Sequence, residues 1–182
     1  MFMKDNYAIV LDFLPHGKPN ERRTEAIAQS IGENFFNLLE VVIREGETVK
    51  PKDRIYIGEE KRDKVKYIKG RISYNDLTSY AKSILEEVLN ELVTKSEKRF
   101  VEFFNKAGPI TTRLHTLELL PGIGKKHMWS IINERKQKPF ESLQEIQDRV
   151  EMLPDPKKMI IKRILAELEG KDKYRLFVAA LR

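Results

Sequence analysis

Short apolar runs separated by turn-forming residues fill the first 74 residues of the chain. One run closes at Pro15 and Gly17, and another stops at Glu45-Gly46-Glu47, which we expect to form a hairpin turn. Residues 22–29 are more polar, and we expect a loop or a short helix there. Four runs at this spacing favour a small barrel or a curled sheet. The expected strands are Tyr7–Leu14, Gly32–Ile43, Arg54–Gly58 and Val65–Tyr74.

The hydrophobic period then changes to that of a helix. Apolar residues from Leu77 to Leu92 recur every three or four positions, which is typical of an amphipathic helix. Thr94 and Glu97 have the spacing of a capping box, so a second helix is expected after them. That helix must end at Gly108-Pro109, because proline does not continue a helix. We expect a helical connector here, and the three expected domains are residues 1–74, 75–108 and 109–182.

The remaining residues have the pattern of short helices with clear start and stop signals. Ser and Asp favour helix starts, proline suits the first helical position, and glycine favours the position after the last turn. We expect the C-terminal part of the chain to be all α. Its expected features are helices over 112–120 and 125–135, a capping box at Ser142 and Glu145, a helix start at Asp155-Pro156 and a helix end at Gly170.

A Gly-x-Gly sequence joins the first two of these helices. Gly122 and Gly124 let the backbone turn tightly and leave its amides uncovered by side chains. The next helix begins at once, so its free N–H groups and positive dipole end face the same point, which suits a phosphate oxygen. Ile123 is the apolar residue expected to anchor the turn on its own helices.

Two lysines, Lys125 and Lys126, add positive charge directly after the turn. With them, the segment resembles the helix–hairpin–helix family, whose consensus hairpin is Pro-Gly-Ile-Gly followed by basic residues. The resemblance implies phosphate contact by the amides around Gly122, Gly124 and Lys125, without readout of bases. The alternative is a tight interhelical turn that binds no ligand.

A second turn, Leu153-Pro154-Asp155-Pro156, lies where a tandem copy of the motif is expected, but it lacks glycine. Its two prolines remove amide donors, and Asp155 places negative charge where a phosphate needs positive charge. We therefore expect residues 141–169 to complete the helical core without binding a ligand.

Two of the expected strands carry aromatic and basic residues on one face. Side chains alternate along a strand, so Ile55 and Ile57 are expected inward, as are Ile68 and Ile72. Aromatic rings interleaved with cations suit single-stranded nucleic acid, which stacks its bases on such rings. An ordinary solvated face with half-packed tyrosines is the alternative. The residues expected outward are Arg54, Tyr56, Tyr67, Lys69 and Arg71.

The composition of the chain excludes several kinds of chemistry. The chain has 182 residues and no cysteine, which excludes disulfides and thiolate chemistry, and its three histidines are scattered. The net charge is +6, and residues 108–182 carry 15 Lys and Arg against 10 Asp and Glu, so an anionic partner is favoured. No apolar run is long enough to span a bilayer, and no signal peptide is apparent. We expect a soluble, cytoplasmic protein with no membrane partner.

Enzyme chemistry is not expected. Helix–hairpin–helix glycosylases need a catalytic Asp, but the candidate Asp155 is explained as a helix cap. Glu134-Arg135-Lys136 is similar to a nuclease signature whose metal-binding Asp is replaced here by Phe140. No nucleotide-binding glycine loop is present, and we expect no metal or cofactor. The three histidines are interpreted as surface or packing residues: His16, His115 and His127.

The resemblance extends beyond the turn. Three segments are similar to the archaeal family catalogued as domain of unknown function 655: Tyr7–Pro15 (YAIVLDFLP), Phe100–Asn105 (FVEFFN) and Arg113–Lys126 (RLHTLELLPGIGKK). That resemblance covers nearly the whole chain. It implies a small barrel of the oligonucleotide-binding (OB) type followed by a helix–hairpin–helix half, in proteins commonly labelled RNA-binding.

The sequence therefore predicts an α+β protein with a small N-terminal OB-like β-barrel, a helical connector and a C-terminal all-α helix–hairpin–helix domain. Its expected function is sequence-tolerant binding of nucleic acid through the turn and the barrel face. Phosphate contacts do not read the 2′-hydroxyl, so RNA is favoured over DNA only by the family resemblance. The alternatives are a DNA-binding accessory factor in repair or replication and a protein-interaction adaptor.

Overall fold

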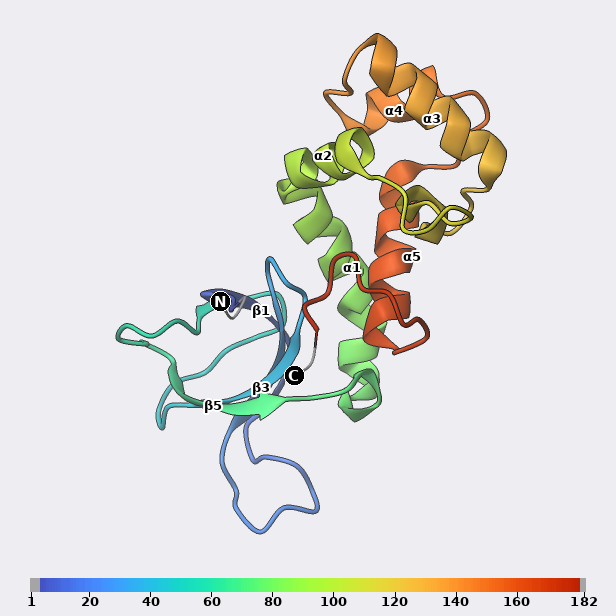
Figure 1. Ribbon diagram of the computed structural model, residues 1–182. Coiled ribbons are helices and arrows are strands. Elements are labelled where there is room, and N and C mark those ends of the chain that lie inside the picture. The colour runs from blue at the N-terminus through green and yellow to red at the C-terminus, as the bar shows by residue number, and fades with distance from the viewer. Residues whose placement is uncertain (1–3, 181–182) are drawn as a thin grey trace. The chain divides into compact units, whose positions relative to one another are not determined.

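A computed structural model describes residues 4–180, and the chain divides into two compact units (Figure 1). The first unit contains the chain up to Val88 and again from Ala166 onward, and the second contains Leu89–Leu165. All five strands belong to the first unit, and most helical residues belong to the second, so the architecture is mixed α+β. The expected domains 1–74, 75–108 and 109–182 follow composition along the chain, whereas this division follows contacts in space.

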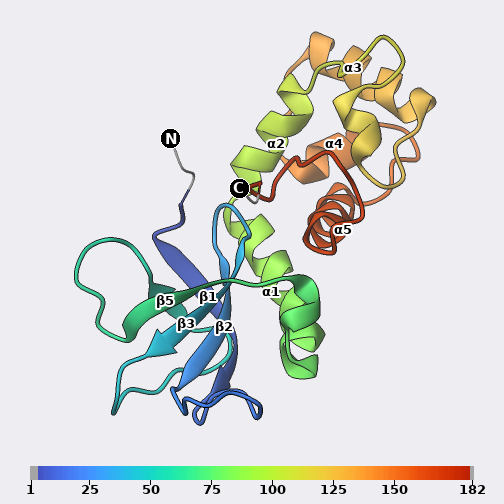
Figure 2. The same cartoon turned by 60° about the horizontal axis from the view of Figure 1, so that its bottom comes forward.

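The five strands form one antiparallel sheet in the order β4-β1-β2-β3-β5 (Figure 2). The sheet curls into a half-barrel, and β4 and β5 are its two edges. In the register of the central strands, Ala8 faces Gly32 and Leu14 faces Ile27, with a bulge between Val10 and Asp12. The strands are β1 (Tyr7–Leu14), β2 (Ile27–Gly32), β3 (Leu38–Ile43), β4 (Arg54–Tyr56) and β5 (Val65–Arg71).

The core of the half-barrel consists of small and β-branched residues that suit a pleated, buried surface. The expected inward positions Ile55 and Ile57 are each 3% exposed and belong to this core. The other buried members are Ala8, Val10, Ala28, Val41, Ile43, Val49 and Val65.

The interpretation of residues 22–29 as a loop or short helix was wrong for its last three residues, because β2 begins at Ile27. The polar Gln29 made this strand look like a loop, yet it is fully buried. Its amide nitrogen donates to Glu40 Oε2 at 3.0 Å and to the carbonyl oxygen of Asp76 at 2.9 Å. Its oxygen accepts from the Thr78 amide at 2.9 Å, so the buried polar group is satisfied.

The prediction of a single strand over Gly32–Ile43 was also wrong. Residues 33–37 form a turn in which Phe36 takes a φ of 58° and is buried, and only Leu38–Ile43 form β3. The expected turn at residues 45–47 exists, with the Glu47 amide donating to the Arg44 carbonyl at 3.0 Å. It does not close a hairpin, because β3 pairs with β2 and β5 and not with β4.

The helical segment after the sheet is confirmed. A 3-10 turn, η1 (Tyr74–Asp76), precedes α1 (Ser79–Lys95), and α2 (Glu97–Lys106) stops just before Gly108-Pro109. The capping box predicted at Thr94 was wrong. Thr94 still belongs to α1, where its hydroxyl donates to the Asn90 carbonyl at 2.8 Å, and Ser96 occupies the cap position.

The helix expected over 112–120 was wrong in extent. Only the 3-10 turn η2 (Thr116–Leu119) forms, because the preceding residues close a loop of their own. In that loop the Thr111 hydroxyl accepts from the Leu114 amide at 3.0 Å, and the Ile110 amide donates to the Leu114 carbonyl at 2.8 Å. A threonine that bonds nearby backbone in this way competes with helix formation.

The other helices follow their signals. They are α3 (Lys125–Gln137), α4 (Leu143–Arg149) and α5 (Pro156–Leu168). The Ser142 hydroxyl accepts from the Glu145 amide at 3.0 Å, and Gly170, with a φ of 72°, follows the end of α5. In the described part of the chain, no helix has the length and apolar character needed to cross a membrane.

Candidate functional site

The turn before α3 is held by local contacts. The Ile123 amide donates to the Leu120 carbonyl at 3.2 Å, and Gly122 takes a φ of 93°, a conformation that favours glycine. Ile123 is 6% exposed, so its side chain anchors the turn. We call residues 120–126 the glycine turn.

The start of α3 presents a row of free amides. Met128 is the first residue of the helix whose amide bonds back, donating to the Gly124 carbonyl at 3.0 Å. Within residues 4–180, the amides of Gly124, Lys125, Lys126 and His127 donate to no acceptor. Gly124 is the cap residue, and a β-carbon placed on it meets no atom within 4 Å. The amides are therefore open to an approaching oxygen.

The two lysines after the turn differ in their surroundings. Lys125 Nζ donates to Glu118 Oε2 at 2.9 Å and to the Arg113 carbonyl at 2.8 Å, so it ties α3 to the preceding loop. The His115 amide, with the Lys125 ammonium, holds the pKa of the Glu118 carboxyl below its ordinary value. Lys126 is exposed, and its ammonium has no partner among the residues that the structure describes. Of the pair, Lys126 is the cation available to a ligand.

His115 has the packing role expected of it. It is 8% exposed and caps η2, with its Nδ1 accepting from the Leu117 amide at 3.1 Å. Burial, with a smaller contribution from Arg135, lowers the pKa of the imidazole. In residues 4–180, no cluster of three or more His, Cys, Asp or Glu side chains is arranged to hold a metal ion.

The second turn repeats the geometry of the first at the backbone. The Leu153 amide donates to the Val150 carbonyl at 3.3 Å, Leu153 is 5% exposed, and Met152 takes the position of Gly122 with a φ of 58°. Asp155 caps α5 by accepting from the Lys157 amide at 2.9 Å. An acceptor already fills this helix start, so the second turn offers no comparable row of open amides.

On the sheet, two of the expected outward residues form an internal cluster. The Arg54 guanidinium lies 3.5 Å from the centre of the Tyr7 ring and donates twice to Glu33, at 2.9 and 3.0 Å. The Tyr7 and Tyr56 rings meet edge to face at 5.3 Å, and the Tyr56 hydroxyl accepts from the Glu60 amide at 3.2 Å. Arg54 and Tyr56 are thus brought together, but both already have protein partners.

The three outward residues of β5 also have partners. The Tyr67 hydroxyl donates to Glu25 at 2.5 Å, and Lys69 donates to Glu21 at 2.7 Å. These two residues meet the segment after β1, whereas Arg71 donates to the Ala180 carbonyl at 3.2 Å. The expected aromatic and basic face is therefore divided among different neighbours.

Ile68 was predicted to point inward, and this was wrong, because it is 36% exposed. The pairing of β5 with β3 shifts register between Glu40 and Val41 and again between Val42 and Ile43, and Ile68 lies in this irregular part of the strand. There it lines a cavity of about 580 Å³ together with Tyr56 and Arg71.

One exposed residue close to the glycine turn was not predicted from the sequence. Trp129 is the only tryptophan of the chain and is 56% exposed on α3. Its position in the helical pattern could have indicated this exposure. Met128, Ile131 and Ile132 form the buried stripe of α3, and Trp129 lies outside it. An exposed indole on the same helix as Lys126 offers a ring face for stacking and an N–H donor, which makes Trp129 a binding candidate.

Comparison with known proteins gives consistent matches over nearly the whole chain. The family described as "Protein of unknown function (DUF655)" matches residues 4–179. A protein of Methanocaldococcus jannaschii, "Uncharacterized protein MJ0038", is 48% identical over 176 residues, which are 96% of this chain and 80% of that protein. The crystal structure of Af1531 from Archaeoglobus fulgidus, titled as a DUF655 structure, is also 48% identical, with a TM-score of 0.88 over 96% of this chain and 100% of that one. The chain belongs to the DUF655 family.

Proposed function

We propose that this protein binds nucleic acid by holding a backbone phosphate on the glycine turn. The open amides of Gly124, Lys125 and Lys126 supply hydrogen-bond donors, and the positive end of α3 and the Lys126 ammonium supply charge. Such contacts do not depend on base identity, so binding is sequence-tolerant.

Gly124 is the observation that carries this proposal. Its φ of −100° is open to any residue, and a β-carbon there meets nothing, so neither backbone strain nor packing requires glycine. Ser, Asp or Asn caps a helix start with its own side chain, but that side chain occupies the amides. Glycine keeps them free for a ligand.

The net charge supports an anionic partner for the second unit. Residues 89–165 carry 15 Lys and Arg against 10 Asp and Glu, which accounts for +5 of the total of +6. A basic surface favours phosphate-rich partners, and RNA, suggested by the family resemblance, is the first probe.

Two finer fold assignments go with this function. We interpret the glycine turn with its two flanking helical segments as a helix–hairpin–helix motif in which η2 stands for a shortened first helix. The second turn is then its non-binding copy. We interpret the five-strand half-barrel as an OB-like barrel that is open between β4 and β5.

The sheet is a secondary surface in the proposal. Phosphate there must compete with Glu33 for Arg54 and with Glu21 for Lys69, so its contribution is expected to be smaller. If bases stack on the tyrosines, the double variant Tyr56→Ala, Tyr67→Ala weakens single-strand binding.

The test compares two glycines of the second unit in equilibrium binding to labelled RNA and DNA, single- and double-stranded, at several salt concentrations. Gly124→Ala adds a methyl group in the open space beside the start of α3, where it obstructs a phosphate, and we expect at least a tenfold loss of affinity. Because alanine is a poorer N-cap than glycine, the variant is also expected to lose up to about 1 kcal/mol of stability. Gly108→Ala is the matched control, because its β-carbon also meets nothing within 4 Å. It is expected to bind like the parent.

Equal affinity of the parent and Gly124→Ala would remove the glycine turn from the binding site. No measurable affinity of the parent for any of the four probes would refute nucleic-acid binding and favour the adaptor alternative.

A further inference from the structure

The exposed face of α3 carries a basic and aromatic stripe that continues from the glycine turn. At 100° per residue, positions 126, 129, 133 and 136 fall within an arc of about 80° on the helix surface. All four residues are exposed, whereas Met128, Ile131 and Ile132 face the core. We call Lys126, Trp129, Asn133 and Lys136 the α3 stripe.

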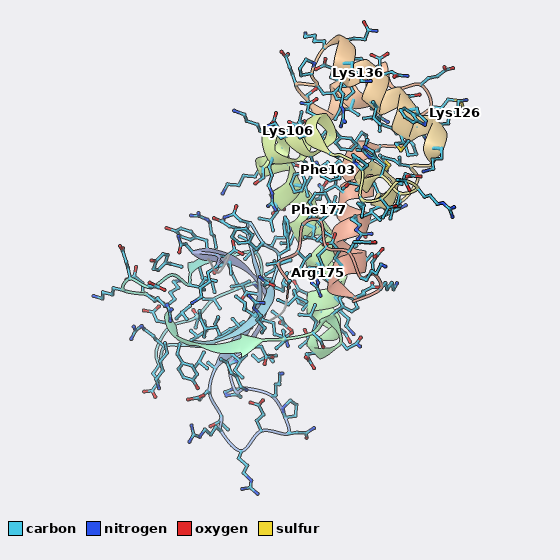
Figure 3. All side chains as sticks on the ribbon, in the orientation of Figure 1. Phe103, Lys106, Lys126, Lys136, Arg175 and Phe177 are labelled. Carbon is cyan, nitrogen blue, oxygen red and sulfur yellow. The ribbon has the colours of Figure 1, made fainter. Side chains whose placement is uncertain are left out.

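The lysines of the stripe lie on both sides of the indole. Lys126 precedes Trp129 by three residues and Lys136 follows it by seven, so the two lysines are about 15 Å apart along the helix axis. Figure 3 shows them toward opposite ends of α3. The only acidic residue of α3, Glu134, lies outside the stripe and pairs with Arg149 at 3.3 Å. The stripe is therefore purely cationic and polar around one ring.

This composition favours a nucleic acid over a protein partner. The centre of a protein interface is rich in apolar residues and poor in lysine, and Trp129 has no exposed apolar neighbour within the stripe. An indole face accepts an unstacked base, and lysines on either side match the flanking phosphates. A fully paired duplex keeps its bases stacked and offers only phosphates to such a surface.

We infer that Trp129 stacks on an unpaired base, with Lys126 and Lys136 on the neighbouring phosphates. The ligand is then a nucleic acid with a single-stranded stretch next to the phosphate held by the glycine turn. This inference rests on the proposed function and specifies its substrate class.

Trp129 allows a direct test, because it is the only tryptophan. Its fluorescence is titrated with an unlabelled oligouridine and with a duplex, while anisotropy of labelled forms of the same probes measures binding independently. We expect oligouridine to quench the indole, and Trp129→Ala to lose about 5- to 100-fold in affinity for the single strand. Trp129→Phe keeps a stacking ring and is expected to retain most of the affinity. The duplex should bind parent and variants alike.

The outcomes separate the two proposals. If the probes bind and Gly124→Ala weakens them, but Trp129 is not quenched and Trp129→Ala is neutral, the stacking inference fails and the proposed function stands. If Trp129→Ala loses affinity for the duplex as much as for the single strand, the substrate class is wrong. If neither probe binds the parent, the proposed function and the stacking inference both fail.

Discussion

Lys125 Nζ and Glu118 Oε2 lie 2.9 Å apart and join the first turn of α3 to η2 across the glycine turn. The same ammonium also donates to the Arg113 carbonyl. Lys125 and Lys126 were predicted to act together as a pair of charges for a ligand, but of the two only Lys126 is unpartnered in the described residues.

Substitutions of the two lysines are therefore expected to have different effects on stability and on binding. Lys126→Ala leaves the melting temperature unchanged and makes the plot of log affinity against log salt shallower by about one, because one phosphate contact is lost. Lys125→Ala lowers the melting temperature by about 1–3 °C, since it removes a bridge between two segments. Thermal melts of both variants measure the change in melting temperature, and binding at several salt concentrations measures the slope. Identical behaviour of the two would contradict the assignment.

Met152 gives a prediction about stability. It stands in the second turn where Gly122 stands in the first, with a φ of 58° and 83% exposure, so its backbone is strained and its side chain packs on little. Met152→Gly relieves about 1–2 kcal/mol of strain and loses part of that to a more flexible unfolded chain. We expect a net gain of about 0.5–1 kcal/mol, seen as a melting temperature raised by about 1–4 °C. Gly122→Ala is the reciprocal change and should destabilise the protein.

Local chemistry explains which parts of the fold were predictable. Ser142 and Asp155 start their helices by bonding amides two or three residues away, and Gly108-Pro109 ends α2 within its own sequence. β2 was missed for the opposite reason. Gln29 is polar, and its burial depends on Glu40 on the neighbouring strand, 11 positions away, and on Thr78, 49 positions away.

In the candidate site too, the features that depend on neighbouring residues were predictable, and those that depend on distant residues were not. The glycine turn was found because its geometry depends on neighbouring residues, and Ile123 is buried as expected. The partners of Tyr67 and Lys69 were not predictable, since Glu25 and Glu21 approach β5 from more than 40 positions away. The exposure of Trp129 could be predicted from its position on α3, but only once the buried face of that helix was known.

His115 predicts a dependence of stability on pH. Burial and the nearby cations Arg135 and Lys125 lower its pKa, while Glu118 opposes this, so folding disfavours the charged form of the imidazole. The unfolded chain binds a proton near pH 6.5, and the folded chain does so only at lower pH. Stability is therefore full above pH 6.5 and falls as the pH drops below it. His115→Asn keeps a cap acceptor without titrating, so we expect its melting temperature to change less than that of the parent between pH 7.5 and 5. If the melting temperatures of the parent and of His115→Asn fall by the same amount between pH 7.5 and 5, the prediction is contradicted.

The last prediction concerns the C-terminal segment of the first unit. Glu167 is 1% exposed, and its Oε1 accepts from the amides of Leu176, Phe177 and Val178 at 2.9, 3.1 and 3.1 Å. Amide bonds to a charged acceptor are stronger than those to a neutral one, so Glu167→Gln is expected to cost about 1–3 kcal/mol.

The loss should be local as well as global, because these amides depend on the Glu167 carboxylate for their acceptor. Hydrogen exchange is expected to show faster exchange at residues 176–178, and trypsin is expected to cut sooner after Arg175. Glu169→Gln is the matched control, because Glu169 is exposed and pairs with Lys171, whereas the amides of residues 176–178 bond to Glu167. It should leave both measurements unchanged. Unaltered exchange at residues 176–178 in Glu167→Gln would show that the segment is held by the packing of Phe177 and Val178 instead, both of which are buried.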